Sequence, residues 1–182
     1  MITKAKISLI RSLEQKKFRQ QEQLYVAEGL RIVSEAILHA REQLVEVLAT
    51  TTWIEQHPEY VRLCGGIVTE ISGKELERIS LLHTPNEVVA LLRPNAQAAI
   101  GLARGKFYLA LERIQDPGNM GTLLRIADWF GFSGVFCSAD SVDVHNPKVV
   151  QSAMGSLFRV PVQYGDLGEM LRGNTADRKS VV

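Results

Sequence analysis

The sequence of 182 residues lacks most features that mark a specialised class of protein. It has 2 cysteines, Cys64 and Cys137, whose separation fits neither a metal motif nor a disulfide framework, so we expect buried, reduced thiols. No apolar run approaches the ~20 residues that span a bilayer, and no signal-peptide core is present. These absences favour a soluble, cytoplasmic protein without a membrane segment.

The sequence also lacks an excess of charge of either sign, because the net charge is only +1. No global field therefore favours nucleic acid or membrane binding. The distribution is uneven, however. The first 20 residues contain one acidic residue and six basic ones, namely Lys4, Lys6, Arg11, Lys16, Lys17 and Arg19. This cluster predicts contacts with phosphate groups, which carry no base specificity.

Residues 1–92 predict a small α/β domain with a mainly parallel sheet, because strand-like and helical segments alternate. The expected strands cover 24–27, 45–49, 67–68 and 88–92. The expected helices are a basic helix over 4–20, one around 32–40, one at Trp53 that stops before Pro58, and one opened by a capping box of Ser72 and Glu75. Residues 93–105 are rich in small residues, Pro and Gly, and predict a linker.

A second α/β unit is expected over 106–182. Its predicted strands are 107–111, 134–137 and 158–162. One predicted helix runs from about 120 to 130 and ends at Gly131, and a second begins at Pro147 after the N-cap Asn146 and ends at Gly155.

The loop 112–119 follows the first strand of this unit, where open α/β sheets bind ligands. Its Asp116-Pro117-Gly118-Asn119 run has an ordinary interpretation as a turn and helix cap. Arg125 lies one turn after Gly121, whose missing side chain allows a ligand or another backbone to approach. Arg125 is thus either a solvated surface residue or a phosphate anchor.

The segment around His145 is equally ambiguous. His145 has no evident sequence partner that would make it a base, which favours a loop histidine. The sequence shows no Walker loop, dinucleotide fingerprint, nucleophile elbow or metal cluster. The residues alone predict a two-domain α/β protein with a ligand site near 112–125.

Three ordered segments resemble the TrmH/SpoU family of RNA ribose 2′-O-methyltransferases in the SPOUT superfamily. Residues 116–128, DPGNMGTLLRIAD, resemble its first signature motif, and residues 145–162 resemble the segment that follows. Residues 16–19 and 25–29 are similar to the start of the small substrate-binding domain.

The resemblance implies methyl transfer from S-adenosylmethionine to a ribose 2′-hydroxyl of rRNA or tRNA by a homodimer with a knotted catalytic domain. It implies catalytic roles for Asn119 and Arg125. RNA contacts are expected at Lys16, Lys17, Arg19, Glu28, Gly29, Lys148 and Ser152. A guanidinium stays protonated, so orienting phosphate or stabilising an alkoxide suits Arg125 better than general-base catalysis.

Two further family motifs, a Gly- and Glu-containing loop and a Ser-Leu-Asn segment, are not found in residues 163–182. They supply most of the family's cofactor pocket, so no cofactor-binding residue is predicted. Residues 177–182 match the translation of a common sequencing adapter. We therefore expect them not to be native and the chain to be an incomplete, inactive fragment.

The main alternative is an RNA-binding module without catalysis, and binding of S-adenosylmethionine would discriminate between the two. A nucleotide-dependent oxidoreductase is disfavoured, because no glycine-rich phosphate loop follows either first strand.

Overall fold

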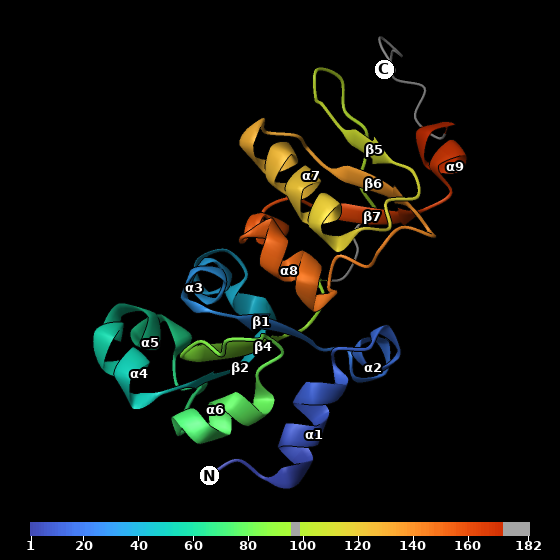
Figure 1. Cartoon of the computed structure of the whole chain (residues 1–182). Helices are drawn as coiled ribbons and strands as arrows, with labels where there is room; N and C mark the ends of the chain where they lie inside the picture. Colours follow the sequence, from blue (N-terminus) through green and yellow to red (C-terminus); the bar gives the residue numbers. More distant parts are fainter. Residues whose placement is uncertain (96–98, 173–182) are drawn as a thin grey trace.

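The structure, a computed structural model, describes residues 1–95 and 99–172. Each half of the chain contains its own sheet, and Figure 1 shows the two sheets with helix α8 (Pro147–Ala153) between them. The proposed adapter-derived residues 177–182 lie outside the described residues. The described residues of the predicted linker, 93–95 and 99–105, form no helix or strand.

The first sheet is mainly antiparallel, so the predicted parallel sheet is wrong. Its order is β1-β4-β2-β3, and only β2 and β3 run parallel. The strand β4 is buried on both faces because helices cover both sides of the sheet. Its apolar sequence therefore fits a parallel and an antiparallel strand equally well. The strands are β1 (Tyr25–Glu28), β2 (Leu44–Ala49), β3 (Val68–Glu70) and β4 (Val88–Leu92).

Helices cover both faces of this sheet (Figure 1). Val89 and Leu91 of β4 pack toward α1 and α6, whereas Val88, Ala90 and Leu92 pack toward α3, α4 and α5. The predicted capping box at Ser72 is confirmed. Helix α5 was not predicted, because Pro58 stops one helix and also occupies the first position of the next. The helices are α1 (Lys4–Ser12), α3 (Leu30–His39), the short η1 (Arg41–Gln43), α4 (Thr51–Gln56), α5 (Pro58–Cys64) and α6 (Gly73–Ile79).

The predicted basic helix over 4–20 is two helices, α1 and α2 (Lys16–Glu22). Leu13 is fully buried at the break. The Arg19 guanidinium donates to the carbonyls of Leu13 and Glu14 at 2.9 and 2.7 Å. These bonds satisfy carbonyls that a continuous helix would have paired internally, and they therefore stabilise the turn.

The second sheet is parallel, with the order β5-β6-β7. The third strand begins at Val162 instead of Phe158, because Leu157 and Phe158 pack into the hydrophobic clusters and form a short 3-10 turn, η2 (Ser156–Phe158). The other elements are β5 (Leu109–Leu111), α7 (Pro117–Trp129), β6 (Val135–Ser138), β7 (Val162–Gly165) and α9 (Leu167–Arg172).

Helix α8 joins the two halves. Val149 and Ala153 pack in the core of the second half, whereas Val150 packs in the core of the first. Gln151 Nε2 donates to the carbonyl of Glu28 at 3.2 Å. The predicted N-cap Asn146 is confirmed by its acceptance from the Lys148 amide at 2.9 Å. Packing on both sides of one helix therefore fixes the halves against each other.

Candidate functional site

The loop that starts α7 lies at the carboxyl end of β5. Asp116 caps the helix by accepting from the Asn119 amide at 2.7 Å, and Pro117 occupies the first helical position. Asn119 and Arg125 are both exposed, and within the described residues neither side chain makes a hydrogen bond or ion pair. Six residues of α-helix place them about 120° apart around α7 and about 9 Å apart along it. They do not converge on one point.

Gly121 allows the close approach of another backbone. A Cβ on Gly121 would lie 2.6 Å from the carbonyl carbon of Ser152 on α8. The Ser152 hydroxyl donates to the Pro117 carbonyl at 2.9 Å, so this predicted RNA contact instead ties α8 to the start of α7. Lys148, by contrast, is exposed on the first turn of α8. The close contact with α8 thus fixes the position of α7, which contains the first signature motif and is called the motif-one helix below.

The three predicted RNA contacts within the basic cluster differ in exposure. Lys16 and Lys17 are exposed on α2, as a phosphate contact requires. Arg19 is only 3% exposed, and its Nε and Nη2 donate to Asp143 Oδ2 at 3.1 and 2.8 Å. Its remaining nitrogen is used at the α1–α2 break. Arg19 therefore links the two halves, which corrects the expectation that it is available to RNA.

Asp143 also binds the backbone amide of His145 at 3.0 Å, and its Oδ1 lies 3.5 Å from His145 Nδ1. Burial raises the pKa of Asp143, but hydrogen bonds from His145 and Arg19 outweigh burial and hold that pKa well below its usual range. The His145 ring lies 4.5 Å from the Tyr25 ring. His145 thus has a carboxylate partner, which the sequence did not reveal.

These groups line a cleft of about 640 Å³ between α2 and the carboxyl ends of β6 and β7. Tyr164 anchors its rim by donating to the Val142 carbonyl at 2.6 Å and accepting from the Val144 amide at 3.0 Å. We call it the α2 cleft; its lining includes Lys16, Arg19, Gln20, Gln23, Asn95, Asp143, His145 and Tyr164. Asn119 and Arg125 do not line it.

Glu28 and Gly29, also predicted RNA contacts, lie elsewhere. The Glu28 side chain is 4% exposed and accepts from the Ser80 hydroxyl and from the Leu81 amide, the latter at 3.0 Å. Its carboxylate therefore holds the loop after α6, and its contact with RNA stays a prediction. Gly29 has a φ of +96° and turns the chain from β1 into α3.

A second ionic link between the halves was also missed from the sequence. Arg159 Nη2 lies 2.7 Å from Asp128 Oδ2 on α7, and its Nη1 pairs with Glu35 on α3. Ser156 donates to the same Asp128 carboxylate at 2.8 Å. These partners are 31 and 124 residues from Arg159 in sequence, so no local pattern predicts them.

Two family models match the chain. Residues 4–90 match the MRM3-like substrate binding domain, and residues 106–182 match the SpoU rRNA Methylase family. The two matches divide the chain into a half similar to a substrate-binding domain and a half similar to an rRNA methylase. The chain belongs to the SpoU (TrmH) family.

Similar proteins carry methyltransferase names. An uncharacterized tRNA/rRNA methyltransferase from Synechocystis is 32% identical over 86% of this chain and 58% of its own length. The Bacillus subtilis 23S rRNA (guanosine(2553)-2′-O)-methyltransferase RlmP is 28% identical over 84% of this chain and 58% of its own length. The chain therefore spans little more than half of these relatives.

Among solved structures, an AdoMet-bound rRNA methyltransferase from Sinorhizobium meliloti has a TM-score of 0.78 and 28% identity. The match covers 94% of this chain and 66% of that one. Because the match covers nearly the whole chain, both halves share the fold of the corresponding parts of that enzyme.

No described helix is long and apolar enough to cross a membrane.

Proposed function

We propose that the protein containing this chain transfers a methyl group from S-adenosylmethionine to a ribose 2′-hydroxyl of rRNA or tRNA. The observation that carries the proposal is the exposed, unpartnered Arg125 on the helix that starts at the carboxyl end of β5, within the matched SpoU segment. The similar protein RlmP is named as a 2′-O-methyltransferase, which supports the ribose 2′-oxygen as the methyl acceptor.

Arg125 suits the RNA side of the reaction. Its guanidinium remains protonated near neutral pH, so it binds a phosphate bidentately or stabilises negative charge developing on the ribose oxygen. Lysine provides a point charge without the planar fork, and so does not replace it. The exposed Lys16, Lys17 and Lys148 add phosphate contacts that are weakened by salt.

S-adenosylmethionine supplies the electrophilic methyl group when bound. Asn119 and Arg125 of the first signature motif are both exposed on α7 and do not line the α2 cleft. No residue is therefore assigned to the cofactor, and the role of Arg125 is confined to RNA.

The proposal is tested by incubating the protein that contains this chain with rRNA and methyl-labelled S-adenosylmethionine. Label is expected at a ribose that then resists alkaline cleavage. Arg125→Ala is expected to abolish transfer without lowering the melting temperature, and Arg125→Lys to restore little. Transfer by Arg125→Ala near the wild-type rate contradicts the role of Arg125. RNA binding without transfer by the wild type favours the RNA-binding module.

A homodimer is part of the proposal. Ile126 and Trp129 in the last turn of α7 and the following residue, Phe130, are 41%, 85% and 69% exposed. Contiguous apolar side chains of this kind are typical of surfaces covered by another protein. Trp129→Glu is expected to convert a dimer to a monomer in light scattering, and an unchanged molar mass contradicts this interface.

A further inference from the structure

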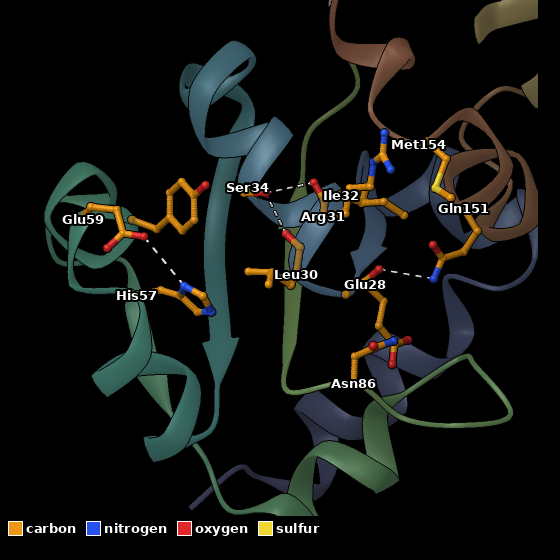
Figure 2. Close-up of a pocket in the computed structure, with 12 residues that line it drawn as sticks. Glu28, Leu30, Arg31, Ile32, Ser34, His57, Glu59, Asn86, Gln151 and Met154 are labelled. Atoms are coloured by element: carbon orange, nitrogen blue, oxygen red, sulfur yellow. Dashed lines mark hydrogen bonds and ion pairs between the residues drawn. The ribbon is translucent and has the colours of Figure 1, made fainter.

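A second cavity, of about 660 Å³, lies between the start of α3, helix α5 and helix α8. We call it the α3–α8 cavity. Its volume falls within the ~300–1,000 Å³ typical of small-ligand sites. Figure 2 shows the lining side chains, which include Leu30, Arg31, His57, Glu59, Tyr60, Asn86, Gln151 and Met154.

One side of this cavity is cationic and polar. Arg31 is exposed, and the described residues provide its guanidinium with no hydrogen bond or ion pair. Figure 2 shows its side chain extending toward Met154, the residue that follows α8. Gln151, on the same side, bonds to the Glu28 carbonyl at 3.2 Å and thereby connects α8 to this wall. The wall therefore exists only where the two halves pack together.

The opposite side is aromatic. The His57 and Tyr60 rings lie 5.9 Å apart, and Trp53 stacks on Tyr60 with 6.4 Å between centroids and 19° between planes. Leu30, which Figure 2 shows between the two sides, is 44% exposed, and Met154 is 38% exposed. Exposed apolar side chains beside rigid aromatic rings favour a flat ligand.

We infer that the α3–α8 cavity binds one unstacked nucleotide of single-stranded RNA, with the base against Tyr60 and His57 and its phosphate at Arg31. This inference rests on the proposed RNA methyltransferase function and names a subsite for that substrate. Single-stranded RNA is read in this way, by stacking on aromatic rings and by contacts to splayed-out bases.

The two carboxylates in the lining agree with this orientation. Glu28 is turned inward and bound by Ser80 and Leu81. Glu59 Oε1 lies 3.7 Å from His57 Nδ1, on the side away from Arg31 in Figure 2. The exposed Glu59 carboxylate thus lies at the aromatic end, the Glu28 carboxylate is held by its own hydrogen bonds, and the free positive charge lies where the phosphate is placed.

The test uses the whole chain and a fluorescein-labelled single-stranded RNA of about ten nucleotides, a length within the ~4–16 that such sites cover. Tyr60→Leu is expected to raise the Kd about 5- to 150-fold, the equivalent of one base stacked on an aromatic ring. Tyr60→Phe keeps the ring and is expected to bind as wild type. Arg31→Gln is expected to weaken binding and to reduce its salt dependence, whereas the exposed Arg62→Gln, outside the cavity, has no effect.

Arg31→Gln changes an exposed side chain, so it reports on the cavity even if Tyr60→Leu fails to fold. Wild-type affinity of Arg31→Gln, together with weakened binding by a Lys16→Gln/Lys17→Gln variant, overturns the nucleotide site and leaves the proposed function standing. An equal loss for Arg31→Gln and Arg62→Gln also overturns it, because the effect is then one of net charge. A wild-type chain that binds no RNA overturns the proposed function itself.

Discussion

Gly121→Ala is expected to destabilise the protein, although alanine is the better helix former. In a helix interior this exchange contributes about 1 kcal/mol of stability when space is available. At Gly121 the new Cβ would lie 2.0 Å from the Ser152 Oγ and 2.6 Å from both its Cβ and its carbonyl carbon. Side-chain rotation would relieve only the hydroxyl contact, since the carbonyl carbon belongs to the backbone of α8.

Helix α8 must therefore shift away from α7. Overpacking a well-packed contact costs about 1–3 kcal/mol, and a backbone clash belongs at the upper end. Subtracting the gain in helix propensity leaves a net loss of about 2 kcal/mol in the free energy of unfolding. For a chain of this size the loss corresponds to a melting temperature lower by about 4–8 °C.

Thermal unfolding followed by circular dichroism measures this difference. The matched control is Gly73→Ala in α6, where an added Cβ meets nothing within 4 Å. Gly73→Ala is expected to leave the melting temperature unchanged or to raise it slightly. A Gly121→Ala variant as stable as Gly73→Ala would show that α7 and α8 are not in close contact, and the account of the motif-one helix would be refuted.

Three further predictions concern charged groups. Stability is expected to fall as the pH drops below about 4, because the folded-state pKa of Asp143 is depressed and protonation removes its stabilising charge. Asp143→Asn is expected to flatten this part of a plot of melting temperature against pH. Arg19→Gln is expected to lower the melting temperature, because Asp143 loses its guanidinium partner and the Leu13 and Glu14 carbonyls lose their donor. Lys16→Gln/Lys17→Gln is expected to leave the melting temperature unchanged and to reduce the log–log salt slope of single-stranded RNA binding by about 0.7 for each phosphate that the lysines no longer neutralise. Arg159→Gln is expected to cost roughly 1 kcal/mol in urea unfolding, and no change would mean that its ion pairs are worth nothing in solution.

Local signals in the sequence determined the helix boundaries that depend on a few neighbouring residues. The capping box at Ser72, the N-cap Asn146 and the turn at Gly131 were all predicted, because each is a hydrogen bond or a backbone angle within about four residues. The resemblance of three ordered segments to a known family likewise identified the family, since a comparison of motifs needs no knowledge of packing.

Strand direction and the use of buried charge were decided by tertiary structure. β4 is apolar throughout because helices cover both its faces, and this pattern is the same for either direction of the strand. Arg19 reads as one more basic residue of a helix, yet it is buried by Asp143, which is 124 residues away. A sequence specifies the charge of a side chain, but only the folded chain decides whether that charge faces water, RNA or a carboxylate from the other half.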